Sequence, residues 1–273
     1  MAVAATDPGA VRVAIAQVEV AADHAANRDA VARVVREAAG AGADLVVLPE
    51  YASGYEPRGV GAEHAEPLDG PFVTLLRGLA REHGLAVVAG TVLPGATPER
   101  GSNAVVAVGA DGELAGTYRK VHLYDAFGAR ESDRLEAGAA DAEPLVLVVR
   151  GMPFGVLTCY DLRFPESARR VVDAGAHVLL YPAAWAAGPL KADHWRTLLR
   201  ARALENTVVV VGVGMAGRTV TGRSLVAGPD GVVALELDEA PQVAVTTLDP
   251  AAIAAARATN PSLENRRYRV TPA

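Results

Sequence analysis

Residues 154–166 read FGVLTCYDLRFPE, which is the pattern of a buried strand, a turn and a helix. The apolar run at the start of this stretch is typical of a strand covered on both faces. Pro165 favours a helix start, because a proline at the first helical position costs no hydrogen bond. Cys159 lies between the two elements, where the strands of open α/β sheets present side chains to ligands. The stretch predicts an α/β fold with a reactive site at a strand end.

Strand and helix patterns alternate in this way along the whole chain. A helical stripe begins at Asn27, the expected N-cap, and Asp111-Gly112 predicts a hairpin turn. The expected strands are 11–20, 44–48, 85–89, 103–108, 113–118, 145–149, 154–158, 178–181, 208–212, 224–227, 232–237 and 243–248, and the expected helices are 27–40, 71–83, 165–174 and 192–205. We expect one mixed-sheet α/β domain, with two sheets and the helices outside.

The composition restricts the class of protein. The chain has 273 residues, of which 51% are hydrophobic and 21% charged, so it is a folded globular chain and not a disordered one. Its formal net charge of −6 argues against a nucleic-acid surface. No apolar run approaches the ~18 residues of a membrane span, so we expect no membrane partner. A single cysteine excludes an internal disulfide, and the expected location is the cytoplasm.

Lysine is scarce in this chain. Of its 26 basic residues, 24 are arginine, and only Lys120 and Lys191 are lysine. A chain that otherwise uses arginine can keep lysine where a compact ammonium with an adjustable pKa is needed, although two such residues can also arise by chance.

Three reactive residue types share a similar context. Glu50 follows the apolar strand LVVLP, Lys120 ends the strand that begins near residue 113, and Cys159 follows FGVLT. Together they supply a base, an oxyanion stabiliser and a nucleophile. Each also has an ordinary structural interpretation: a buried small side chain for the cysteine, a solvated turn residue for the glutamate, and a solvent-exposed cation for the lysine.

Other chemistries fit the sequence less well. The six histidines show no HxH or HExxH spacing for zinc, and no phosphate-binding glycine loop or GxGxxG unit is present. A papain-like pair of Cys159 with His122 is conceivable, but it leaves Lys120 without a role. A catalytically silent binding protein is the alternative outside the enzymes.

Three segments resemble the motifs of the nitrilase, or carbon–nitrogen hydrolase, superfamily: LPE at 48–50, YRKVHLYD at 118–125 and GVLTCYDLRFPE at 155–166. The similarity continues in ES at 131–132, YPAAW at 181–185, HWRTLLRARALEN at 194–206 and NPSLENRR at 260–267. CYDLRFPE with RARALEN is similar to the Nit-type branch of ω-amidases and deaminated-glutathione amidases. True nitrilases typically have Trp-Glu after the cysteine, so Tyr160-Asp161 indicates an amide substrate.

The resemblance implies a four-layer α-β-β-α sandwich with two mixed sheets. It implies one domain over residues 1–273, with a core of about 10–250 and a C-terminal dimerisation tail at 251–273. The expected assembly is a homodimer or a higher homo-oligomer, made by segments 165–172 and 262–270. No cofactor and no metal are expected.

The resemblance also implies roles for individual residues. Glu50 is the general base, and Cys159 attacks the amide carbon to form a thioester. Lys120 and the backbone N–H of Tyr160 hold the oxyanion. Glu131 matches a second glutamate that positions the lysine and the substrate, whereas the sequence around it alone suggests a surface charge.

Substrate recognition is expected from residues near the cysteine. Arg163 can receive a substrate carboxylate, or it can pair with Asp161 or Glu166 instead. Trp185 matches a pocket-lining position of the family, and Tyr124 is expected at the mouth of the site, as are Tyr51 and Tyr55.

The expected reaction is hydrolysis of a small, carboxylate-bearing amide with release of ammonia. The alternatives are hydrolysis of an N-carbamoyl amino acid or amine, and a silent binding protein on this fold. Residues 186–195, AAGPLKADHW, differ from the simpler Gly-Pro-His-Trp run of ω-amidases, which leaves the exact amide open.

Overall fold

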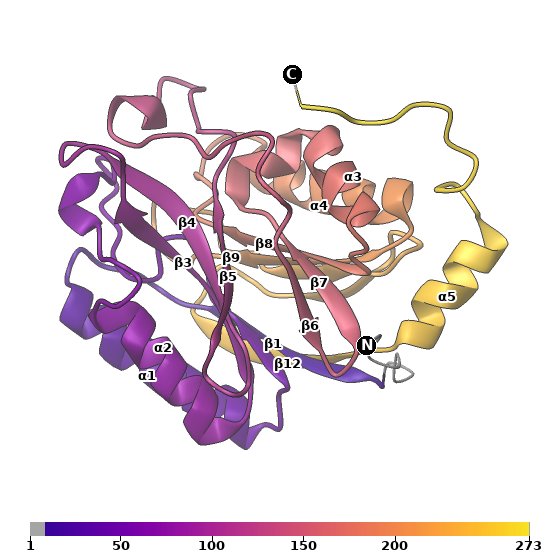
Figure 1. The fold of residues 1–273 in the computed structure, drawn as a ribbon, viewed down its shortest axis with the longest axis horizontal. Coiled ribbons are helices and arrows are strands. Elements are labelled where there is room, and N and C mark those ends of the chain that lie inside the picture. Colours follow the sequence, from indigo (N-terminus) through magenta and orange to yellow (C-terminus); the bar gives the residue numbers. More distant parts are fainter. Residues whose placement is uncertain (1–8, 273) are drawn as a thin grey trace.

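The structure is a computed structural model in which residues 9–272 are described. Two six-stranded sheets pack face to face, with helices on both outer sides (Figure 1). The first sheet has the order β12 (Gln242–Leu248), β1 (Val11–Gln17), β2 (Leu45–Val47), β3 (Ala86–Pro94), β4 (Gly101–Val108) and β5 (Leu114–Arg119). The second has the order β11 (Val233–Glu236), β10 (Leu225–Ala227), β9 (Val209–Gly214), β8 (Val178–Ala183), β7 (Met152–Val156) and β6 (Val146–Val149).

Both sheets are mixed, as the sequence predicts. In the first, β1, β2 and β3 are parallel, and β12, β4 and β5 are antiparallel to their neighbours. In the second, β7, β8 and β9 are parallel, and β6, β10 and β11 are antiparallel to theirs. The parallel strands lie in the middle of each sheet.

The helices form the two outer layers. They are α1 (His24–Gly40), α2 (Pro71–His83), α3 (Pro165–Asp173), α4 (Lys191–Asn206) and α5 (Pro250–Thr259). An apolar core joins α1 and α2 to the first sheet, a second core fills the space between the sheets, and a third joins α3 and α4 to the second sheet. The expected α-β-β-α sandwich is therefore confirmed.

The start of α1 corrects one expectation. The helix begins at His24 because the carboxylate of Asp23 accepts hydrogen bonds from the N–H groups of Ala25 and Ala26, at 2.9 and 3.1 Å. Asn27 is not the N-cap. It is buried inside the helix, and its amide donates to the carbonyls of Ala21 and Ser53 at 2.7 and 3.1 Å. Asn27 thus ties the helix to the loop that follows Glu50.

The last helix, α5, was not expected from the sequence. It lies at one end of the sandwich, and the C-terminal segment runs back from it past α3 (Figure 1). Asp249 caps the helix through the N–H of Ala251 at 2.8 Å, and Ile253 is buried against the core between the sheets. Only one side chain of α5 is buried, which explains the weak periodic signal in its sequence.

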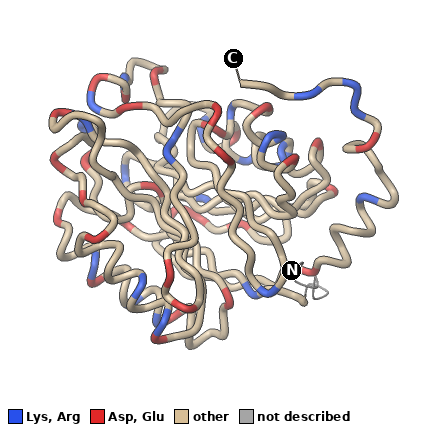
Figure 2. Tube along the Cα trace, in the orientation of Figure 1, with Lys and Arg blue, Asp and Glu red and all other residues tan. Residues whose placement is uncertain are grey.

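Acidic and basic positions are interspersed along the trace (Figure 2). This distribution agrees with the small net negative charge of the chain. No helix among residues 9–272 combines the length and the apolar character needed to cross a membrane.

Candidate active site

The residues singled out in the sequence meet at one end of the sandwich. Glu50 follows β2 and Lys120 follows β5, both in the first sheet, whereas Cys159 follows β7 of the second sheet and begins a 3-10 turn, η3 (Cys159–Arg163). Glu131 begins another 3-10 turn, η2 (Glu131–Asp133). All four side chains line one cavity of about 510 Å³. The strand ends of both sheets therefore contribute to a single site.

Lys120 lies between the two carboxylates. Its ammonium nitrogen is 2.9 Å from Oε1 of Glu50 and 2.9 Å from Oε2 of Glu131, and its side chain is almost fully buried. Burial alone would lower the pKa of Lys120, but Glu131 and Glu50 outweigh it and hold that pKa well above its usual value. An ammonium has three hydrogens, so one remains for a further acceptor.

Glu50 is fixed on several sides. Oε1 accepts from Nδ2 of Asn103 at 2.7 Å as well as from Lys120, and Oε2 accepts from the backbone N–H of Ala184 at 2.7 Å. Gly90 of β3 lies directly against the backbone of Glu50 and Tyr51, where any added Cβ would overlap their main-chain atoms. The glycine therefore lets the two segments approach closely enough to position the carboxylate.

Glu131 is not the surface charge that its sequence surroundings suggest. Oε2 accepts from Lys120 and from the N–H of Tyr124 at 2.6 Å, and Oε1 accepts from the Tyr51 hydroxyl at 2.6 Å and from Asn103 at 2.8 Å. Burial would raise the pKa of Glu131, but Lys120 and these donors outweigh that effect and lower it. Glu131 is thus an ionised, buried carboxylate that orients the lysine.

Cys159 is a strained, buried nucleophile candidate. Its backbone is in the left-handed region with φ of 44°, a conformation that side chains other than glycine rarely adopt, and it is 6% exposed. Burial, followed by the charge of Glu50, raises the pKa of the thiol well above its usual value, although Lys120 acts in the opposite direction. The thiol is therefore neutral at neutral pH and needs a base to activate it.

A buried aspartate holds the turn that carries the cysteine. Asp161 accepts from the Tyr118 hydroxyl at 2.8 Å and from the N–H of Thr158 at 3.1 Å, and its Oδ1 is 2.9 Å from Nδ1 of His122. These contacts join the end of β5 to η3, so the position of Cys159 depends on the segment that carries Lys120. His122 does not line the cavity that Cys159 lines, which argues against a papain-like pair of His122 with the cysteine.

The expected substrate-binding residues lie in different places. Trp185 and Tyr124 line the cavity, and the ring of Tyr160 packs edge-on against Tyr124 with centroids 5.1 Å apart. Arg163 pairs with neither expected partner, Asp161 nor Glu166. Its Nη2 is 3.3 Å from Nδ1 of His194, and its guanidinium carbon is 5.1 Å from the centroid of the Trp185 ring.

Three residues of the site have contacts that the sequence did not predict. Asn103 donates to both buried carboxylates, yet it lies inside an apolar strand with no motif around it. Tyr51 was expected only at the mouth, but its hydroxyl binds Glu131. Lys191 lines the cavity, and the scarcity of lysine in the sequence was the signal for it.

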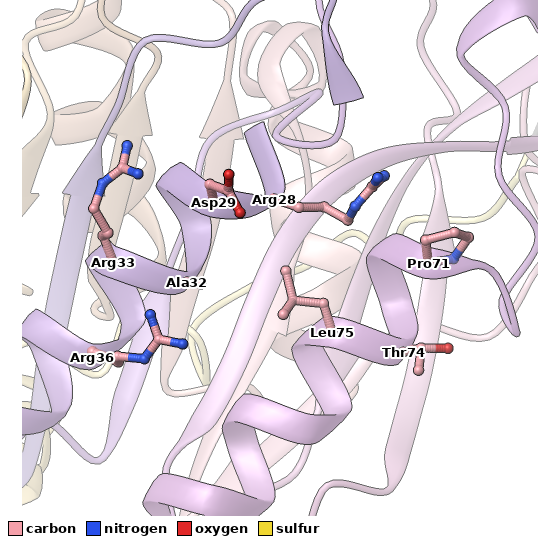
Figure 3. A pocket seen from close by; sticks show the side chains of 8 residues that line it. All are labelled: Arg28, Asp29, Ala32, Arg33, Arg36, Pro71, Thr74 and Leu75. Carbon is pink, nitrogen blue, oxygen red and sulfur yellow. The ribbon is translucent and has the colours of Figure 1, made fainter. Parts of the chain in front are cut away.

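A second hollow of about 580 Å³ lies away from these residues, between α1 and α2 (Figure 3). Arg28, Arg33 and Arg36 extend from α1 beside it, and Thr74 and Leu75 of α2 form the other wall. Its lining residues include no cysteine, lysine or glutamate, so it does not compete with the cavity around Cys159 as the reactive site. Among residues 9–272, no group of three or more His, Cys, Asp or Glu side chains is arranged to hold a metal ion.

Comparison with known proteins places this geometry in a family. The model of the family described as carbon-nitrogen hydrolase matches residues 12–258. The deaminated glutathione amidase of Escherichia coli O157:H7 is 39% identical over 244 residues, which cover 89% of this chain and 92% of the relative. The chloroplastic omega-amidase of Arabidopsis thaliana is 29% identical over 272 residues, covering 93% and 72%.

A solved structure agrees with these matches. A CN-hydrolase superfamily protein of Xanthomonas campestris has a TM-score of 0.85 and 32% identity, covering 96% of this chain and 99% of that one. The nitrilase-like fold expected from the sequence is thereby confirmed, and the reaction class is hydrolysis of a carbon–nitrogen bond. The chain belongs to the carbon-nitrogen hydrolase family.

Proposed function

We propose that this protein hydrolyses a small, carboxylate-bearing amide through a thioester on Cys159 and releases ammonia. One observation carries the proposal: the ammonium of Lys120 lies 2.9 Å from both Glu50 and Glu131 in the cavity that Cys159 lines. This arrangement offers a base, an oxyanion donor and a nucleophile around one space. The similarity to a deaminated glutathione amidase and an omega-amidase supports an amide as the substrate.

Acylation begins at the neutral thiol. Glu50 takes the thiol proton while Sγ of Cys159 attacks the amide carbon, and the carbonyl electrons move onto oxygen. The third hydrogen of the Lys120 ammonium and the backbone N–H of Tyr160 stabilise that oxyanion. The N–H of Tyr160 is suitable because the first N–H groups of a helical turn have no partner inside it. Glu50 then gives its proton to the nitrogen, ammonia leaves, and a thioester remains.

Deacylation uses the same residues. Glu50 takes a proton from a water molecule, and the resulting hydroxide adds to the thioester carbon. The same two donors hold the second oxyanion. When the intermediate collapses, the sulfur leaves and recovers a proton from Glu50, and the acyl group departs as a carboxylic acid. In this scheme Glu131 positions Lys120 and does not touch the reacting atoms.

A panel of amides tests this function. Ammonia release is measured with α-ketoglutaramate, deaminated glutathione, an N-carbamoyl amino acid, an aliphatic amide and a nitrile. We expect turnover of the carboxylate-bearing amides, and its loss in Cys159→Ala with an unchanged melting temperature. Release of carbon dioxide with ammonia from the carbamoyl compound would favour that alternative. A folded protein that turns over none of them would favour the silent binding protein.

We also propose that the protein is cytoplasmic and forms a homodimer or a higher homo-oligomer through α3 and the C-terminal segment. In support, Arg266 forms a bidentate ion pair with Asp173 of α3, at 2.6 and 3.0 Å, and Tyr268 is 91% exposed. The tail is thus attached beside α3 and leaves an aromatic side chain free for a second copy. Light scattering of the full chain and of a chain ending at residue 260 tests this; an unchanged mass would contradict it.

A further inference from the structure

Lys191 is a buried cation in the wall of the reactive cavity. It is the first residue of α4, and Leu190 before it has φ of 62°, so the chain turns sharply into the helix at this point. The backbone carbonyl of Lys191 accepts a hydrogen bond from Nε1 of Trp185 at 2.9 Å. The residue is 7% exposed and lines the same cavity as Cys159 and Glu50. Its backbone is thus fixed beside the cavity that holds the reacting groups.

The ammonium of Lys191 has aromatic neighbours. It donates to the hydroxyl of Tyr124 at 2.8 Å and lies 3.4 Å from the centroid of the Phe127 ring. Among residues 9–272, no Asp or Glu oxygen lies within ion-pair distance of it, whereas Lys120 has two. Burial, and then Arg163, lowers the pKa of Lys191. A buried cation without an anion is unfavourable, because it has lost water and gained no opposite charge.

Arg163 adds to this excess of positive charge. Its guanidinium carbon lies 5.6 Å from the centroid of the Phe127 ring, and no carboxylate of the described residues pairs with it. Arg163 does not line the cavity, however, so its positive charge acts on a ligand there through its electrostatic field and not through a direct contact. Phe127 therefore has two cations near its ring that no carboxylate of the described residues pairs, and of these two only Lys191 lines the cavity.

We propose that Lys191 binds the carboxylate at the far end of the substrate's acyl chain and so makes the protein selective for ω-amides of dicarboxylic acids. This inference rests on the proposed function, since it assigns a specificity residue to the same site. The substrate carboxylate supplies the anion that Lys191 lacks, with the amide carbon held at Cys159. Lys191 thus has the role of binding the substrate carboxylate, which the sequence suggested for Arg163.

The test compares two amides of similar length, glutaramate and butyramide, of which only the first carries a carboxylate. The ratio of their kcat/KM values is measured for wild type, Lys191→Met, Arg163→Met and Arg130→Met. Arg130 is the matched control, because it lines the cavity but pairs with Asp133 at 3.3 Å on the surface. We expect Lys191→Met to lower the ratio about 10- to 100-fold, the effect of one charge-assisted hydrogen bond. We expect Arg130→Met to change it less than about twofold.

Two results would overturn the assignment. One is a ratio that stays the same in Lys191→Met because both amides slow equally, which would mean that Lys191 only supports Tyr124 and Phe127. The other is a larger loss of the ratio in Arg163→Met. If wild type hydrolyses neither these two amides nor any amide of the panel above, the proposed function fails instead. The affinity for glutarate, measured by calorimetry for wild type and for Lys191→Met, then tests the role of Lys191 independently of turnover. Equal affinities would refute that role. Lys191→Gln serves if the methionine variant does not fold.

Discussion

Replacing Glu131 by glutamine should both destabilise the protein and slow it. The carboxylate accepts hydrogen bonds from four donors, two at each oxygen. Glutamine has nearly the same shape, but it offers one oxygen and one NH₂ group. In one orientation of the amide, its NH₂ group faces Lys120 and the N–H of Tyr124. In the other orientation it faces Tyr51 and Asn103, so two donors meet a donor in either case. The variant also leaves Lys120 with one carboxylate in place of two.

The size of the effect follows from burial. Lys120 and Glu131 are 2% and 10% exposed, so their ion pair is only weakly screened. Removing one member of such a pair costs about 3–5 kcal/mol. For a chain of this length, each kcal/mol lowers the melting temperature by roughly 2 °C, which gives a fall of about 6–10 °C. Misplacing an oxyanion donor should lower kcat by a further factor of about 100–1,000.

Calorimetry and ammonia release measure the two effects, and Glu63→Gln is the control. Glu63 pairs with Arg134 at 3.0 Å, but both side chains are about half exposed, so that pair contributes about 0–1 kcal/mol. Because the pKa of Glu131 is lowered in the folded protein, its stabilisation is present above the unfolded carboxyl value of about 4.3 and is lost as the pH falls through the folded value. The difference in melting temperature should therefore be full at pH 7 and shrink below about pH 4. Equal melting temperatures for Glu131→Gln and wild type at pH 7 would refute the four-donor account.

Three further changes have definite expected outcomes. Glu50→Gln removes a charge that raises the pKa of Cys159, so thiolate absorbance should appear at a lower pH than in wild type while turnover is lost; a higher onset would contradict this. Gly90→Ala should abolish turnover and lower the melting temperature, because the new Cβ overlaps the backbone of Glu50; normal kinetics would show that the strand yields freely. Gly78→Ala, on an open side of α2, should instead stabilise the protein by about 0.5–1 kcal/mol in urea unfolding, and a loss of stability there would contradict the structure.

The elements that the sequence predicts best are those with local signals at both ends. The helix at 71–83 is an example, because Pro71 begins it and Gly84, with φ of 64°, ends it. The N-cap of α1 was wrong for a related reason: Asp23 and Asn27 are both good capping residues, and only the tertiary contacts of Asn27 decide between them. α5 was missed because its many alanines favour a helix but form no apolar stripe.

The candidate site divides in the same way. Glu50, Lys120 and Cys159 could be singled out because each ends a strand pattern and matches a family motif. The network around them could not be predicted, because Asn103 meets Glu131 and Glu50 across 28 and 53 positions of the sequence. Such contacts depend on the register of strands β3, β4 and β5, and no local sequence pattern determines that register. The partner of Arg163 could not be predicted either, because it depends on contacts between distant segments of the chain.

The pairing of β1 with β12 has a consequence for biosynthesis. β1 leaves the ribosome more than 200 residues before β12, yet one of its edges pairs along seven residues with that strand. Until residues 242–248 emerge, that edge offers unpaired backbone groups beside an apolar surface, which is a template for aggregation. A chain cut short before Gln242 would carry this open edge permanently. We therefore expect such fragments to aggregate or be degraded, so that the emergence of β12 acts as the quality-control step for the whole sandwich.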